Sequence, residues 1–297
     1  MKRREDVVNV RSGTIFVVLA AALWATLGLF YRHLIGDYGL APLTIAFYRA
    51  AVGCACLLVG LLTLRPALLR VRAGDLAFFA AMGLGPIALF YVVYIYAIDL
   101  AGVATAAVLL YTAPAIVTVA SWRLYGESLT PRKMAALSVT FAGCLLVARA
   151  YDPALVRLNL PGILFGLASG FTYALYSILG KRAVQRYSMW TVMVYSLAFG
   201  TLFLLPLQSP AAIASAIANP ESAALLLLLG LGPTLAAFGL YTAALTRLPA
   251  GTASIIATLE PFIATALAFL FLGETLAVPQ MLGGALILGA VMLLGEA

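Results

Sequence analysis

The chain contains few charged residues and few side chains that could catalyse a reaction. Charged residues make up 10% of its 297 residues, and hydrophobic residues make up 64%. A soluble domain carries roughly 25% charged residues, so this composition excludes a protein that folds in water. The one histidine and the three cysteines (Cys54, Cys56 and Cys144, all inside apolar runs) match no metal or redox spacing. We therefore expect no bound metal and no cofactor.

Sequence motifs of the common catalysts are also missing. The absence of a G-x-x-x-x-G-K-[ST] phosphate loop argues against ATP hydrolysis by this chain. Neither H-E-x-x-H nor G-x-S-x-G occurs. A membrane enzyme would need a nucleophile with its base, or a set of metal ligands. We expect that the protein is not an enzyme.

The apolar residues are gathered in ten runs, separated by short connections that carry most of the charges. About twenty apolar residues are enough for a helix to cross the ~30 Å hydrocarbon layer of a membrane. We therefore expect an all-α polytopic membrane protein with ten transmembrane helices. The predicted spans are residues 13–34, 42–64, 75–98, 101–124, 131–148, 160–181, 189–207, 222–246, 250–272 and 279–295.

The second half of the chain repeats the first. The tetrad Gly83-Leu84-Gly85-Pro86 recurs as Gly230-Leu231-Gly232-Pro233, an offset of 147 residues that holds without a gap for about sixty residues. At this offset Tyr94 corresponds to Tyr241, Thr105 to Thr252, Pro114 to Pro261, Gly126-Glu127 to Gly273-Glu274, and Met134 to Met281. Each half, 13–148 and 160–295, holds five spans. Because five is odd, the second half must enter the membrane from the opposite side, which predicts an inverted repeat.

The first span belongs to this repeat as well. At an offset of 149 residues, Gly13, Trp24 and Arg32 correspond to Gly162, Tyr173 and Lys181. The basic start of the chain before an apolar stretch could otherwise pass for a signal peptide. The repeat indicates that this stretch is a helix of the mature protein.

Basic residues are distributed unequally between the two sides of the predicted topology. With the N-terminus inside, fourteen of the 18 Lys and Arg residues lie on inner segments, three lie on outer segments, and Arg49 lies within a span. Cytoplasmic loops carry such an excess of positive charge. We therefore expect both termini to be cytoplasmic. The net charge of +7 follows from this bias, and no nucleic-acid partner is needed to explain it.

Spans four and nine share the element P-x(11)-G-E, which runs from Pro114 to Glu127 and from Pro261 to Glu274. Together with Trp24 and Phe47-Tyr48-Arg49 in a five-plus-five arrangement, this element resembles the EamA branch of the drug/metabolite transporter superfamily. The resemblance covers essentially the whole chain. It implies a secondary transporter of the bacterial inner membrane that exports small metabolites, often amino acids, through a central cavity open to each side in turn. One subfamily of the branch exports aromatic and other neutral amino acids, and the chain is similar to it.

The partners expected of such a protein are a small-molecule substrate and the lipid bilayer, and we expect it to act as a monomer. Other functions stay open at this point. A transporter of phosphorylated or other anionic metabolites would need several basic residues at mid-depth, and the chain offers one. A passive channel has no sequence signature that would exclude it.

Two charged residues fall inside predicted spans. Arg49 lies about seven residues below the outer end of span two, where a charge should face protein or water rather than lipid. It could grip a substrate carboxylate with two hydrogen bonds, or it could bind helix-end carbonyls or a neighbouring acid. Glu260 lies near mid-membrane in span nine. It could bind a substrate amine, couple transport to protons, pair with Arg49, or hydrogen-bond the backbone that Pro261 frees. Their repeat equivalents are Ser196 and Ala113, so neither role is symmetric.

Aromatic residues and prolines complete the candidate site. A cavity walled by tyrosines would accept an apolar side chain and hydrogen-bond the polar end of a zwitterion, although helix packing explains the same residues. The candidate substrate-binding residues are Trp24, Arg49, Tyr91, Tyr94, Tyr111, Tyr173, Tyr241 and Glu260. Proline frees a helical carbonyl and favours a kink, which makes Pro86, Pro114, Pro233 and Pro261 candidate hinges.

Glu127 and Glu274 each follow a glycine at a predicted helix end, on opposite faces of the membrane. Gly126 and Gly273 suit a C-terminal cap, and Thr130-Pro131 suits the start of the next helix. We expect a paired structural role for the two glutamates rather than a role in gating.

Overall fold

The computed structural model describes the backbone of residues 2–295 and the side chains of residues 10–294. The side chains of Lys2, Arg3 and Arg4, which contribute to the predicted charge bias, therefore lie outside the described residues. Every regular element in the described part of the chain is a helix, which confirms the predicted all-α fold. In the first half the helices are α1 (Lys2–Ala25), α2 (Leu27–Gly36), α3 (Pro42–Leu64), η1 (Pro66–Leu69), η2 (Ala73–Asp75), α4 (Leu76–Gly83), η3 (Leu84–Leu89), α5 (Phe90–Leu110), α6 (Ala113–Tyr125) and α7 (Pro131–Val147).

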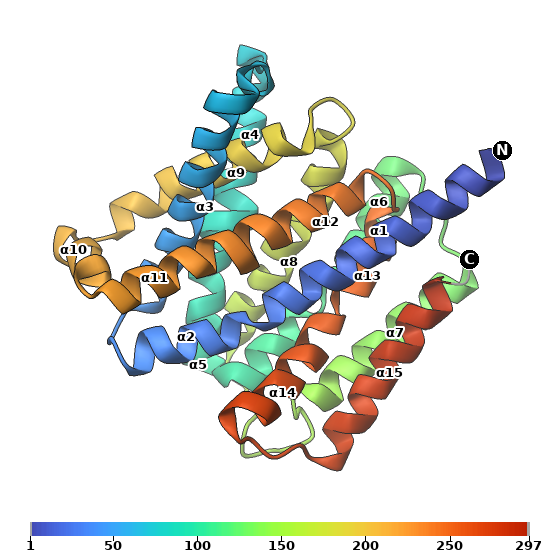
Figure 1. Ribbon diagram of the computed structural model, residues 1–297. Helices are drawn as coiled ribbons and strands as arrows, with labels where there is room; N and C mark the ends of the chain where they lie inside the picture. Colours follow the sequence, from blue (N-terminus) through green and yellow to red (C-terminus); the bar gives the residue numbers. More distant parts are fainter. Residues whose placement is uncertain (1, 296–297) are drawn as a thin grey trace.

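The second half contains the equivalent spans, divided into helices at different residues. Its elements are α8 (Leu160–Ala183), α9 (Met189–Leu204), η4 (Leu205–Leu207), α10 (Pro210–Ala218), α11 (Pro220–Leu229), η5 (Gly230–Ala236), α12 (Ala237–Leu245), α13 (Ala250–Ala257), α14 (Leu259–Leu272) and α15 (Val278–Gly295). The short helix α10 lies between spans seven and eight. In Figure 1 it lies at the end of the molecule far from the two termini.

Each of the ten predicted spans coincides with one helix or with a series of helices. Seven segments are long and apolar enough to cross a membrane, and one of them, Ala73–Tyr125, is 53 residues long. It contains both span three and span four. The chain leaves the helical conformation at Gly102, whose φ is 78°, and this break divides the segment into the two spans. Such a φ favours glycine, which has no Cβ to clash. The shorter α7 and α15 are the fifth and tenth spans.

All four candidate hinge prolines lie where a helix is irregular. Pro86 and Pro233 lie in the π-helices η3 and η5. Pro114 follows the break between α5 and α6, and Pro261 follows the break between α13 and α14 at Thr258. A proline lacks the N–H that would bond the preceding turn, and π-turns relieve the resulting clash. The irregularities therefore occur twice, at equivalent places in the two halves.

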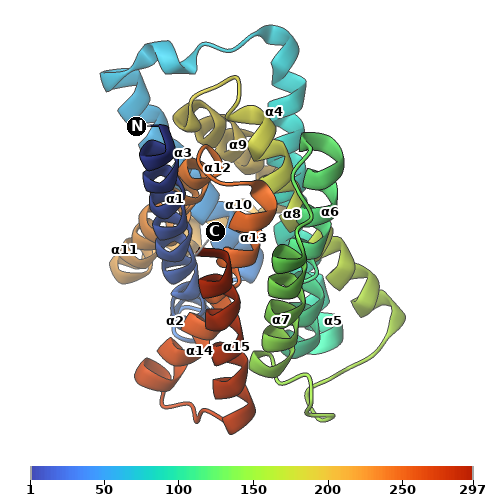
Figure 2. The ribbon, with the colours of Figure 1, turned by 90° about the vertical axis from the view of Figure 1, so that its right-hand side faces the viewer.

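The packing of the helices is consistent with an inverted repeat. The α5–α8 contact joins spans three and six, and the α12–α1 contact joins their equivalents, spans eight and one. Spans five and ten pair with each other as α7 and α15, which lie side by side in both views (Figures 1 and 2). A Cβ built on Gly143 would lie 2.7 Å from the carbonyl oxygen of Gly283. Only glycine allows these two backbones to come so close.

The predicted caps at the ends of spans four and nine are confirmed. Gly126 and Gly273 adopt the left-handed conformation with φ values of 66° and 68°. Thr130 begins α7, and its hydroxyl accepts a hydrogen bond from the backbone N–H of Lys133. These caps fix the position of the glutamate that follows each glycine.

Candidate functional site

Arg49 is buried in α3, with 5% of its surface exposed. Its Nε donates a 3.1 Å hydrogen bond to Oγ1 of Thr234 in η5, and its guanidinium carbon lies 4.9 Å from the centre of the Tyr91 ring. The side chain of Tyr31 is a further polar neighbour. Among the residues that the structure describes, Arg49 has no carboxylate in an ion pair. Its positive charge is oriented but not neutralised.

Glu260 lies in the first turn of α14, just after the break in span nine, and its side chain is half-buried. It lies within electrostatic range of Arg49, yet the two form no ion pair. Its carboxylate accepts no hydrogen bond within residues 10–294. The predicted alternative of a direct Arg49–Glu260 pair is therefore not what the structure shows. The two opposite charges face the same region from spans two and nine without touching.

Tyrosines from three further spans surround Glu260. Tyr94 in α5, Tyr111 at the end of α5, and Tyr173 in α8 all lie within electrostatic range of its carboxyl group. Their side chains are half-buried, and their hydroxyls form no hydrogen bond with another described residue. The Phe90 ring stacks on Tyr94 at 5.7 Å and contacts Tyr173 at 5.4 Å. Polar tips without partners next to an aromatic wall are what a polar ligand with an apolar side chain would meet.

Trp24 and Tyr241 form a second aromatic group next to the first. Their ring centres are 5.3 Å apart, and Trp24 also lies 5.7 Å from Phe238. Both side chains are buried, and the hydroxyl of Tyr241 shares a 2.7 Å hydrogen bond with Ser177. Tyr176 and Thr242 form a similar bond of 2.8 Å. The tyrosine hydroxyls of this group already have partners, and its rings pack spans one, six and eight together.

The two ends of the repeat are packed differently. In span nine, α13 has seven of its eight residues buried, whereas α14 has only Leu259 buried. At one end, α13 packs against α6. The equivalent crossing at the other end, between the start of span four in α5 and α14, is not a packed pair within the described residues. We call the end with the α6–α13 contact the Glu127 end, and the end with α5 and α14 the Glu274 end. Within the described residues, spans four and nine pack against each other at the Glu127 end and do not at the Glu274 end.

One residue of this arrangement has no signal in the sequence. Thr234 follows Pro233 and reaches Arg49 only because η5 packs against α3. Phe90 joins the tyrosines through its place one turn before Tyr94. The described residues contain no group of three or more His, Cys, Asp or Glu side chains that could hold a metal. The described cysteines are free thiols.

Sequence comparison gives this arrangement a family context. The sequence profile of the EamA-like transporter family matches the chain twice, over residues 11–149 and 160–295. An uncharacterized transporter of Archaeoglobus fulgidus is 32% identical over 288 residues, covering 96% of each chain. A protein of Streptantibioticus cattleyicolor described as a probable terminal-alkyne amino-acid exporter is 27% identical, covering 94% of this chain and 92% of its own.

A solved crystal structure confirms the fold. It superposes with a TM-score of 0.81 over 95% of this chain and 96% of its own, at 22% sequence identity.

Proposed function

The chain belongs to the EamA-like transporter family and is a secondary transporter of that type, not an enzyme, and we propose that it exports amino acids or similar small metabolites by alternating access. The substrate site that we propose lies between spans two, three, four, six and nine. It is built from Arg49, Tyr91, Tyr94, Tyr111, Tyr173 and Glu260, on a packed base formed by Trp24 and Tyr241.

One observation carries the proposal for the substrate. Arg49 and Glu260 act on each other electrostatically but are not in contact, and neither is paired with another charged residue in the described structure. Unpaired charges are costly at this depth unless water or a ligand solvates them. A zwitterion placed between them would give its carboxylate to Arg49 and its ammonium group to Glu260. An amino acid has both groups on one carbon.

The aromatic wall suits an uncharged side chain. Phe90, Tyr94 and Tyr173 offer ring surface, and the unbonded tyrosine hydroxyls would hydrogen-bond a polar group at the edge. This combination favours aromatic and other neutral amino acids over small hydrophilic ones. The similarity to a protein described as an amino-acid exporter supports the same class. A phosphorylated substrate has less support, because Arg49 is the one basic residue that the sequence places at mid-depth.

The hinges that we propose are the four prolines. Each lies at a helix irregularity, and the breaks before Pro114 and Pro261 divide spans four and nine into two parts. A helix in two parts can move one part while the other stays packed. In span nine, seven of the eight residues of α13 are buried, whereas in α14 only Leu259 is, so the break at Thr258 separates two environments.

We place the protein in a bacterial inner membrane with the Glu127 end in the cytoplasm. The excess of Lys and Arg on the segments at this end supports that orientation. Both termini would then be cytoplasmic. The Glu274 end would face the periplasm.

The zwitterion model can be tested by binding to the purified protein. Phenylalanine should raise the thermal unfolding temperature, since a ligand that binds the folded state stabilises it. The matched analogues 2-phenylethylamine, which lacks the carboxylate, and 3-phenylpropionate, which lacks the amine, should each stabilise much less. Equal stabilisation by all three compounds would show that the site recognises neither the carboxylate nor the amine of the ligand. Stabilisation by no neutral amino acid in a panel would contradict the proposed substrate class.

A further inference from the structure

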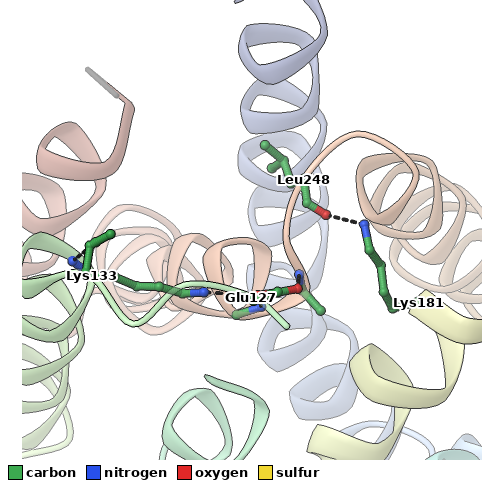
Figure 3. A network of polar contacts seen from close by, with 7 residues as sticks. Glu127, Lys133, Lys181 and Leu248 are labelled. Carbon is green, nitrogen blue, oxygen red and sulfur yellow. Dashed lines mark hydrogen bonds and ion pairs between the residues drawn. The ribbon is translucent and has the colours of Figure 1, made fainter. Parts of the chain in front are cut away.

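At the Glu127 end, one carboxylate bonds the end of span four to the start of span nine. Oε1 of Glu127 accepts a 2.6 Å hydrogen bond from the backbone N–H of Ala250, and Oε2 accepts one of 3.2 Å from Gly251. Oε2 also accepts a 3.0 Å bond from Nζ of Lys133. Figure 3 shows Glu127 between Lys133 and the start of α13. The side chains of Glu127 and Lys133 are 9% and 7% exposed. We call this set of contacts the Glu127 latch.

The latch joins the two halves of the molecule. Glu127 and Lys133 belong to the first repeat, whereas Ala250 and Gly251 begin α13 of the second. A carboxylate bonded to free N–H groups at a helix start is a strong, charge-assisted contact. Just before α13, the carbonyl oxygens of Leu245 and Leu248 each accept a 2.7 Å bond from Nζ of Lys181. Figure 3 shows the bond to Leu248. Lys181 is in the same repeat as these carbonyls. Among the described residues, the hydrogen bonds of the Glu127 latch therefore add to the α6–α13 packing that joins span four to span nine.

The surfaces behind the latch are not themselves well bonded. A Cβ built on Gly251 would lie 3.1 Å from the hydroxyl oxygen of Thr118 in α6, so α6 and α13 approach closely here. The buried hydroxyls of Thr118, Ser121 and Ser254 have no hydrogen-bond partner in the described structure. Water could satisfy them if the helices moved apart. The Tyr241–Ser177 and Tyr176–Thr242 pairs of spans six and eight, by contrast, are fully bonded.

The Glu274 end contains the equivalent residues in a different arrangement. Glu274 is the repeat equivalent of Glu127, and Arg32 is that of Lys181. Glu274 accepts a 3.4 Å bond from Arg32, and both side chains are more than half exposed. Gln280, the equivalent of Lys133, bonds Ala277 and Val147 instead. The helix start that corresponds to Ala250 and Gly251 is Val103 and Ala104, and the Glu274 side chain accepts no hydrogen bond from it in the described structure.

From this comparison we propose that Glu127 and Glu274 are alternating latches of the transport cycle. In the state described here the Glu127 latch is formed, whereas Glu274 is bonded to Arg32 and caps no helix start. When the halves exchange conformations, Glu127 releases α13, and Glu274 caps the start of span four at Val103 and Ala104. This inference rests on the proposed alternating access, but it does not depend on which substrate is carried.

The test measures which end is open by the reactivity of single cysteines. In a background with Cys54, Cys56 and Cys144 replaced by alanine, Ser254→Cys probes the closed end, since Ser254 is 3% exposed. Its repeat equivalent Ala107 is half-buried, and Ala107→Cys probes the open end. Each probe is labelled with a membrane-impermeant maleimide in right-side-out and inside-out vesicles without substrate. The control is Glu221→Gln, which removes an exposed carboxylate that accepts a bond from Tyr38.

Glu127→Gln should raise the labelling rate of Ser254→Cys about tenfold or more and lower that of Ala107→Cys, because the charge-assisted bonds of the closed latch are lost. Glu274→Gln should not raise Ser254→Cys labelling, and combining it with Glu127→Gln should move both rates back toward those of the parent. Ser254→Cys labelling in Glu127→Gln within about twofold of the Glu221→Gln control would overturn the latch. If Glu274→Gln raises the labelling rate of Ser254→Cys as much as Glu127→Gln does, the two glutamates do not act in alternation.

A second variant guards against loss of folding. Ala250→Pro removes the N–H that bonds Oε1 of Glu127, at the first helical position, where proline is well tolerated. The preceding Pro249 already has the extended conformation that a following proline requires, with φ −55° and ψ 139°. Ala250→Pro should raise the labelling rate of Ser254→Cys as Glu127→Gln does. If the rate does not rise, the proposed latch is wrong. Because the readout needs no substrate, a failure of amino-acid transport leaves this result unaffected.

Discussion

Nε of Arg49 donates a hydrogen bond to Oγ1 of Thr234, joining span two of the first repeat to the π-helix of the second. The repeat equivalents of the two residues are Ser196 and Ile87, which cannot form such a bond with each other. The pair therefore exists once in the molecule. It fixes the direction of a guanidinium whose charge no acid in the described structure neutralises.

We predict that Thr234→Val weakens substrate binding, because Arg49 loses the bond that orients it. A hydrogen bond to a charged group is worth about 1.5–3 kcal/mol, so the KM of transport should rise about tenfold or more. The matched control is Thr140→Val, which removes a buried hydroxyl that has no hydrogen-bond partner in the described structure. That variant should keep the parental KM. Equal effects of the two substitutions would show that Thr234 acts through packing alone.

Arg49→Lys should reduce amino-acid transport by about tenfold or more, since lysine keeps the charge but loses the planar two-point grip on a carboxylate. The folded yield, measured by size-exclusion chromatography, should stay at the parental level. A variant that does not fold would show a structural role for Arg49. Transport equal to that of the parent would dismiss the carboxylate clamp.

Glu260→Gln tests whether the central carboxyl group couples transport to protons. Glutamine keeps the shape of the side chain but cannot bind and release a proton. We expect an imposed pH gradient to accelerate transport by the parent protein in liposomes and to leave the variant unaffected, while exchange at equilibrium continues in both. A parent protein that ignores the gradient would be a facilitator, and the coupling role of Glu260 would be wrong.

The predicted topology can be checked with two reporters. One fused after Glu296, which lies outside the described residues, should read cytoplasmic, and one inserted near Asp152 should read periplasmic. Five spans per half and the excess of positive charge on one side give this expectation. Both reporters on the same side would contradict the inverted arrangement.

Gly283→Ala should destabilise the α7–α15 contact. A Cβ at this position would lie 2.6 Å from the carbonyl oxygen of Gly143, and overpacking of this kind costs about 1–3 kcal/mol. Gly289 lies on the same helix with nothing within 4 Å of an added Cβ, so Gly289→Ala is the control and should not lower stability. Thermal unfolding in detergent measures both. A loss of stability as large in Gly289→Ala would show that helix composition matters, not the close approach.

The architecture could be predicted from the sequence because its physical causes are local. Apolar runs long enough to cross a membrane determine the spans. Prolines within the runs determine the kinks, and glycines at their ends determine the caps. The 147-residue offset then relates one half to the other. The predicted caps at Gly126 and Gly273 were confirmed for this reason, since a left-handed residue at a helix end depends on its near neighbours.

The contacts between spans could not be predicted in the same way. Glu127 and Glu274 are indistinguishable in the sequence, and we expected a shared structural role for them. In the structure Glu127 is buried on the start of α13, whereas Glu274 is exposed and bonded to Arg32. This difference arises from how the halves are packed in one state of the molecule, which no single segment determines. The partner of Arg49 was missed for the same reason, because Thr234 lies 185 residues away in the chain.

Counterflow of labelled amino acids in proteoliposomes tests the proposed function most directly. Liposomes loaded with an unlabelled neutral amino acid, such as phenylalanine, should accumulate the labelled form transiently when they contain the parent protein. Empty liposomes should show no accumulation, and liposomes with Arg49→Lys should show much less. If folded parent protein gives no counterflow with any amino acid of a broad panel, amino-acid export is the wrong function.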